Sequence, residues 1–218
     1  NNKGYHGQTT PNASQPWGWN AAGIQATGVD GLIVRNNYIH ETKIAVQVNG
    51  NYPGRPSSNC LVENNEFANI GGYSDDQSHV LYLECNGERV RHNKSTQPPG
   101  WSSVYKSRGT CTEVTDNWGL GGDRVVDLVE SGNTRSANPT CADVVANNYF
   151  ERFDGLDNDA FIHFGGDGPN IKKYKKNTLQ VLNNTFVSRR GGSVLVRVSA
   201  WSQTVVALNN VFQWTKMA

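Results

Sequence analysis

Side chains suited to acid–base and charge chemistry recur at one place, the outward positions of short segments in which apolar and polar residues alternate. The expected outward column contains Gln25, Gln47, Glu84, Lys106, His163 and Arg197, and either Asp127 or Glu130 completes it. Flanking columns are expected to contain Asn49, Tyr82 and Arg108. A solvated sheet face is one explanation, but solvation alone would favour Ser, Thr and Asn. The mixture of amine, guanidinium, phenol, imidazole and carboxylate groups instead predicts a groove for an extended polymer.

Three of these residues are carboxylates on neighbouring segments. A glycoside hydrolase needs two carboxyl groups that flank the scissile bond, and Glu84, Asp127 and Glu130 are candidates. Neighbouring strands lie roughly 5 Å apart, so steps of one or two strands cover both the retaining and the inverting geometry. Salt bridges to Lys106 and Arg108 are an equally simple role for these carboxylates.

The side chains of the outward column must be positioned by an internal repeat of the sequence. Each copy is an alternating segment that ends in Asn-Asn or X-Asn and is followed by an aromatic or apolar residue, as in residues 32–39 and 179–186. A second alternating segment precedes each copy and usually ends at a Gly. The second Asn of the copies falls at positions 37, 65, 93, 117, 148, 184 and 210. This uneven spacing favours a solenoid with loop insertions over a closed propeller.

The expected fold class is all-β: a right-handed parallel β-helix of about seven to eight rungs, with residues 1–218 as a single domain. Each rung is predicted to contain a strand, a Gly turn, a second strand, an Asn turn and a variable loop. Stacking in parallel buries the apolar face of each strand, and the hand follows the rule for parallel crossovers. The turn Asn residues are expected to form a ladder, with Phe67, Phe150, Phe186 and Phe212 stacked inside.

A solenoid requires polar caps at its two ends. Residues 1–5 resemble an Asn turn without its strand, and the last rung ends soon after Phe212. The chain is therefore expected to be part of a longer solenoid, or to have its ends covered by further rungs or a partner chain.

Charge and cysteine content indicate the compartment and the partners. The formal net charge is +1 and there is no apolar run of membrane-spanning length, so neither nucleic acid nor a membrane is an expected partner. The four Cys lack metal-binding spacing, which favours two disulfides and a secreted, periplasmic or cell-surface location over four free thiols. Cys111 and Cys141 occupy similar places in successive rungs and are expected to pair, which leaves Cys60 with Cys85.

The tandem rungs resemble the pectate-lyase-like β-helix superfamily over essentially the whole chain. Residues 79–82, 106–109 and 126–130 are similar to secreted bacterial β-helix proteins. The Lys-Ser-X-Gly turn at 106–109 resembles the alginate lyase and chondroitinase B group, in which a Lys acts as the base. In that group an Arg lies about one rung further on, where this chain has Asp127 with Arg124 nearby.

This resemblance implies β-elimination on a uronate-containing polysaccharide. Arg108 or Ca²⁺ would neutralise the uronate carboxylate, and Lys106 would remove the C5 proton. Tyr82 or His163 would protonate the leaving oxygen. The metal-binding candidates are Glu84, Asp127 and Glu130, which offer the oxygen ligands that Ca²⁺ prefers, and the substrate-binding candidates are Gln47, Glu84, Asp127, Arg197 and Trp101.

Two rival classes of function remain beside the lyase. One is a glycoside hydrolase of the same fold, and the other is a non-catalytic β-helix that binds glycan or forms part of a surface structure or fibre. Trp101 illustrates the ambiguity, because a loop Trp either stacks on a sugar ring or only pins its loop to the helix.

Overall fold

The computed structural model describes residues 22–50, 57–71, 78–98, 105–122, 124–130, 141–153, 160–166, 177–189, 193–199 and 204–215. These ranges contain strands and turns and no helix, so the all-β prediction is confirmed for them. Trp101 and residues 1–5 lie outside the described residues. Within the described part of the chain, no helix is long and apolar enough to cross a membrane.

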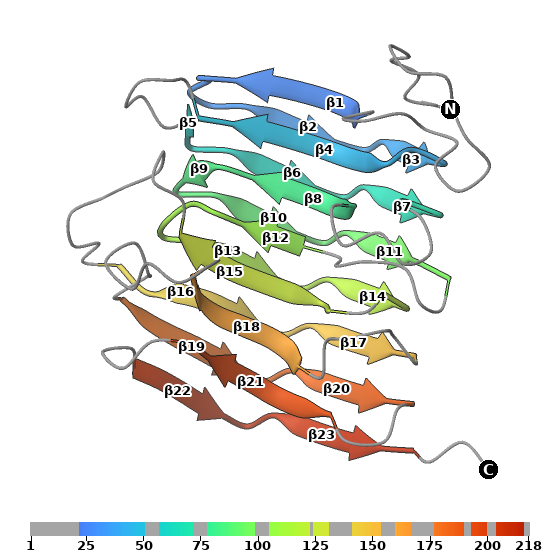
Figure 1. The fold of residues 1–218 in the computed structure, drawn as a ribbon, viewed down its shortest axis with the longest axis vertical. Helices are drawn as coiled ribbons and strands as arrows, with labels where there is room; N and C mark the ends of the chain where they lie inside the picture. The colour runs from blue at the N-terminus through green and yellow to red at the C-terminus, as the bar shows by residue number, and fades with distance from the viewer. Residues whose placement is uncertain are drawn as a thin grey trace.

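The strands form three parallel sheets of seven strands each, stacked along one axis (Figure 1). Sheet 1 contains β1 (Ala22–Thr27), β4 (Ile44–Asn49), β8 (His79–Leu83), β12 (Tyr105–Ser107), β15 (Val126–Glu130), β18 (Ala160–Gly166) and β21 (Val194–Val198). Sheet 2 contains β2 (Ile33–Arg35), β6 (Leu61–Glu63), β10 (Arg89–Arg91), β13 (Glu113–Thr115), β16 (Asp143–Ala146), β19 (Thr178–Leu182) and β22 (Thr204–Leu208). Sheet 3 contains β3 (Tyr38–His40), β7 (Glu66–Ala68), β11 (Lys94–Thr96), β14 (Trp118–Leu120), β17 (Tyr149–Arg152), β20 (Thr185–Ser188) and β23 (Val211–Trp214). A short pair, β5 (Ser57–Ser58) and β9 (Cys85–Asn86), lies apart from these sheets.

Each sheet takes one strand in turn as the chain advances, so every circuit of the chain adds one layer to all three sheets. This arrangement is compatible with a parallel β-helix, and the described strands form one continuous stack. The sequence predicted two strands and a variable loop per rung, and the third strand is a correction. It was missed because the sheet 3 residues that directly follow the Asn turn, such as those of β3, were read as the aromatic or apolar end of the repeat and not as a strand.

The corner between sheets 2 and 3 holds the predicted Asn ladder, and each of its two turn residues has a distinct role. The first residue of the turn takes the left-handed conformation, as in Asn147 with φ 58°, which Asn tolerates. The second is a ladder Asn. Asn148, which is 3% exposed, donates its side-chain amide to Asn184 Oδ1 at 2.9 Å and to the Val114 carbonyl at 2.8 Å. Its Oδ1 accepts the backbone N–H of Asn117 at 2.9 Å. The same bonds repeat along the stack, so the ladder prediction is confirmed.

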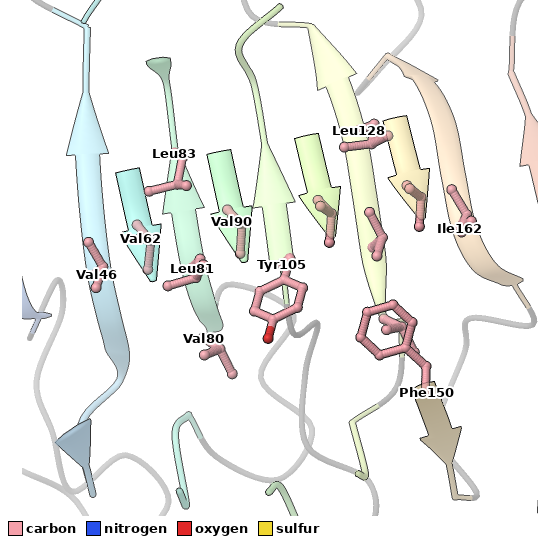
Figure 2. Packing of buried hydrophobic residues seen from close by; sticks show 14 of the residues in the cluster. Val46, Val62, Val80, Leu81, Leu83, Val90, Tyr105, Leu128, Phe150 and Ile162 are labelled. Carbon is pink, nitrogen blue, oxygen red and sulfur yellow. The ribbon is translucent and has the colours of Figure 1, made fainter. Parts of the chain in front are cut away.

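The interior is apolar and formed by residues from all three sheets. Figure 2 shows Val46 and Leu81 of sheet 1 near Val62 and Val90 of sheet 2, with Ile162 of sheet 1 further along the same stack, and all five are nearly or fully buried. Burial of this kind, at roughly 25 cal/mol per Å² of apolar surface, is the main source of stability for a stack of short strands.

The predicted Phe stack is correct only in part. Phe150, Phe186 and Phe212 occupy one row on successive strands. Ser95 and Gly119 separate Phe67 from them in that row, so Phe67 does not join the stack. Gly119 provides room for the Phe150 ring, since a Cβ there would lie 2.8 Å from a Phe150 ring carbon. Two small residues therefore interrupt the aromatic row between Phe67 and the three successive Phe residues.

Both predicted disulfides are present. Cys60 pairs with Cys85 across 25 residues, and Cys111 pairs with Cys141 across 30 residues. The two bonds link neighbouring coils and indicate an oxidising, extracellular type of environment.

Apolar side chains are exposed on both terminal coils. They include Ile33 on the first coil, and Leu208, Val211 and Trp214 on the last described coil. That further rungs or a partner chain cover these ends stays a prediction.

Candidate functional site

Sheet 1 brings seven side chains into one outward column by its strand register. They are Gln25, Gln47, Tyr82, Lys106, Asp127, His163 and Arg197. Asp127, and not Glu130, fills its place in the column. The side chain of Glu130 is outside the described part of the structure.

The position of Glu84 is a correction, because the sequence placed it in this column and Tyr82 in a flanking one. The register pairs Lys106 with Tyr82, and Glu84 lies two residues further on. Both Leu81 and Leu83 are buried, so either register satisfies the alternation of β8, and only the backbone pairing distinguishes them. Glu84 is nearly buried and its Oε2 accepts the Gly50 N–H at 3.0 Å. The Glu84 side chain therefore stabilises the turn at Gly50, beside the column.

Asp127 is the centre of the charged cluster and is only 1% exposed. Its Oδ1 lies 2.7 Å from His163 Nδ1 and 3.0 Å from Arg124 Nη1. Its Oδ2 lies 3.2 Å from Lys106 Nζ. Residues that are 21 to 36 positions away in sequence thus meet around one carboxylate because their strands are neighbours, and Arg124 joins them from just before β15.

The surroundings of Asp127 keep its carboxylate ionised. Burial alone would raise its pKa, but the hydrogen bond from His163 and the charges of Lys106 and Arg124 together hold that pKa well below its usual range. Asp127 is consequently a fixed negative charge, and it cannot supply a proton near neutral pH.

His163 has its tautomer fixed by this carboxylate. Since Asp127 can only accept, Nδ1 carries the proton of the 2.7 Å bond. Arg124 Nη1 approaches the same nitrogen at 3.4 Å, but two donors cannot bond each other, so Arg124 donates to Asp127 instead. The lone pair of neutral His163 is then at Nε2, which lies 3.0 Å from Ser199 Oγ.

Two residues of this cluster were not selected from the sequence. Arg124 was noted only as lying near Asp127, and its place three residues earlier gave no strand signal. The register places Ser199 beside Gly165, and the other coils have residues of different types at this position. No sequence signal therefore marked Ser199.

The remaining predicted residues lie around this centre. Arg108 places its guanidinium carbon 5.4 Å from the ring centre of Tyr82, a cation–π contact. Gln47 donates to Asn49 Oδ1 at 3.2 Å. Arg197 is exposed and pairs with His163 in the register.

The structure does not favour a metal at Asp127. Its two oxygens already face an imidazole N–H, a guanidinium and an ammonium group. Over the described ranges, no group of three or more His, Cys, Asp or Glu side chains is arranged to hold a metal ion. The predicted calcium set of Glu84, Asp127 and Glu130 therefore has no geometric support at Asp127.

No family model, no curated protein and no solved structure matches this chain. The fold and site by themselves define its class. It is an all-β protein of stacked parallel coils whose first sheet presents a linear column of charged and hydrogen-bonding side chains. An aspartate–histidine pair flanked by cations lies within that column.

Proposed function

We propose that this protein is a secreted right-handed parallel β-helix that cleaves an acidic, uronate-containing polysaccharide by β-elimination. The rule for parallel crossovers supports the hand, and the disulfides support secretion. A column over seven neighbouring strands extends for roughly 29 Å, which suits several sugar units of an extended polymer.

The observation that carries the proposal is the cluster of Lys106, Arg124 and His163 around buried Asp127. β-Elimination requires a positive charge for the uronate carboxylate, a base for the adjacent proton and an acid for the leaving oxygen. Lys106 and Arg124 place two positively charged groups beside Asp127, and positive charge is what a uronate carboxylate requires. His163 Nε2 is the proton acceptor, because its Nδ1–H is held by Asp127.

Lys106 is assigned a different role from the one implied by the family resemblance. Lys106 forms an ion pair with Asp127 at 3.2 Å, a contact that suits Lys106 as a fixed charge better than as a base. Tyr82 is its neighbour in the column and is the candidate acid for the leaving oxygen. Arg108 and Arg197 supply further positive charge along the groove.

The hydrolase alternative has weaker support. A glycoside hydrolase needs a carboxylic acid whose pKa is raised, whereas the pKa of Asp127 is lowered. No step is assigned to Ca²⁺, because the groups around Asp127 are already cations and donors.

The test is incubation with alginate, pectate and chondroitin sulfate, with and without Ca²⁺, followed by the ultraviolet absorbance of unsaturated uronates. We expect wild-type protein to produce this absorbance on at least one polymer. His163→Asn is expected to lower the rate by about 10²- to 10⁴-fold, and Lys106→Gln by about 100-fold.

Lys94→Gln is the matched control, because Lys94 forms an exposed ion pair with Glu66 at 2.9 Å on sheet 3, and its rate should equal that of the wild type. Absence of both absorbance and new reducing ends on every polymer would leave only glycan binding. Wild-type turnover in both site variants would place the chemistry elsewhere.

A further inference from the structure

Ser199 lies directly beyond β21 and beside His163 on the outer side of sheet 1. Its Oγ is 3.0 Å from His163 Nε2 and 3.4 Å from the Phe164 carbonyl. It also accepts the Gly166 N–H at 3.2 Å. Nε2 of the fixed tautomer has a lone pair and is the nearer acceptor. The Ser199 hydroxyl therefore donates to His163 Nε2 and not to the Phe164 carbonyl.

The contacts form a chain of three residues from three successive coils, with Asp127 on β15, His163 on β18 and Ser199 just after β21. Ser199 Oγ bonds His163 Nε2 at 3.0 Å, and His163 Nδ1 bonds Asp127 Oδ1 at 2.7 Å. Lys106 and Arg124 hold Asp127 from its other sides. This is the order of groups that activates a hydroxyl nucleophile: an alcohol, a neutral imidazole, and a buried carboxylate that orients the imidazole.

Gly165 provides the space that the hydroxyl needs. A Cβ at Gly165 would lie 1.8 Å from Ser199 Oγ, so no other residue fits at that position while Ser199 keeps its place. Gly165 also has φ +151°, which side-chain-bearing residues rarely adopt. The end of β18 is therefore shaped to accept Ser199 against His163.

We propose that Ser199 is a nucleophile that hydrolyses an ester, with His163 as its base and Asp127 as the residue that positions His163. Ser199 Oγ attacks the carbonyl carbon as its proton passes to Nε2. The C–O bond to the alcohol then breaks, and the alcohol leaves with that proton, which gives an acyl-serine. Water attacks the acyl-serine with His163 as base, releases the carboxylic acid and restores the hydroxyl.

The substrate class is an O-acyl ester on a sugar hydroxyl, and this choice rests on the proposed polysaccharide function. The nucleophile itself does not depend on that function. Gly166 N–H donates to the Ser199 hydroxyl oxygen itself, so this contact holds the attacking oxygen in place. The His163 imidazole cannot accept the Ser199 proton and the uronate proton at the same time. Ester hydrolysis and chain cleavage therefore occur in separate binding events.

The test uses a fluorophosphonate probe, which modifies activated serines covalently, together with hydrolysis of 4-nitrophenyl acetate. Mass spectrometry of the wild-type protein is expected to find the label on Ser199. Ester hydrolysis is expected to fall by at least about 100-fold in Ser199→Ala. Asp127→Asn is expected to move the acidic limb of the pH–rate profile to lower pH, a change that loss of folded protein does not cause.

Ser58→Ala is the control, because the Ser58 hydroxyl donates to the Asp30 carboxylate at 2.6 Å with no imidazole between them. It should hydrolyse the ester at the wild-type rate. Absence of label on Ser199 in folded wild-type protein, or equal hydrolysis in wild type and Ser199→Ala, would overturn the proposal. Labelled Ser199 without any unsaturated uronate would refute the lyase and leave the nucleophile standing. Polymer cleavage without label on Ser199 would refute the nucleophile and leave the lyase standing.

Discussion

Asp127→Ala is expected to lower the free energy of unfolding by about 3–5 kcal/mol. The substitution leaves Lys106 and Arg124, whose side chains are 11% and 16% exposed, without the carboxylate that neutralises them. Two neighbouring cations then repel each other in a poorly solvated place, and His163 loses the acceptor of its Nδ1–H. Urea unfolding followed by circular dichroism measures the change.

Glu66→Ala provides the comparison for this prediction. Glu66 pairs with Lys94 at 2.9 Å, but both side chains are about half exposed, and such pairs contribute roughly 0–1 kcal/mol. If Asp127→Ala proves as mild as Glu66→Ala, the central role of Asp127 in stability is wrong.

The lowered pKa of Asp127 also predicts how the stability of the protein depends on pH. Its pKa is lower in the folded protein than the usual value of about 3.9 expected after unfolding. The unfolded chain therefore binds the proton first, so the stabilising contribution of Asp127 is complete above about pH 5 and is lost progressively as the pH falls below that. In Asp127→Asn this part of the acid dependence should disappear, which urea midpoints measured between neutral and acidic pH will test.

Asn148→Ala is expected to be the other severe substitution, with a loss of about 3–5 kcal/mol. The Asn148 side chain forms four hydrogen bonds, two as donor and two as acceptor. Its removal leaves the Asn117 N–H, on a residue that is itself only 3% exposed, without its acceptor. The denaturant midpoint is expected to fall with little change in the slope of the transition.

Asn37→Ala tests the same side chain at the exposed end of the ladder. Asn37 donates to the Arg35 carbonyl and to Asn65 Oδ1. Asn65 Oδ1 keeps the backbone N–H of Asn37 as a donor after the substitution. The expected loss is below about 1 kcal/mol, and equal losses at positions 37 and 148 would show that burial does not control the ladder's contribution.

The local chemistry of the turns explains why so much of the fold could be predicted. An Asn-Asn pair supplies a left-handed residue and then a buried amide, and both requirements depend on residue type alone. The Cys111–Cys141 disulfide followed from the similar places of these residues in successive rungs, and Cys60–Cys85 was the pair that remained. The strands of sheet 3 escaped prediction because their residues directly follow the Asn turn and were read as the end of the repeat.

The candidate site could be predicted only as a set of residues on one wall. Lys106, His163 and Arg197 were expected on a shared outward face with either Asp127 or Glu130 between them, and the register places Asp127 there in one column with the other three. The sequence could not predict that Tyr82 occupies the column in place of Glu84. Two registers of β8 against its neighbours bury the same apolar residues equally well.

The sequence by itself determined the repeat, the turns, the alternation of inward and outward residues and the pairs of cysteines, since each depends on residues close in the chain or on their spacing. Only the tertiary structure decided which neighbours meet across strands. It placed three partners around the buried Asp127 carboxylate and set the hydroxyl of Ser199 against His163. Those contacts depend on backbone register and on the space left at Gly165, and a shift by one or two residues would separate the same side chains.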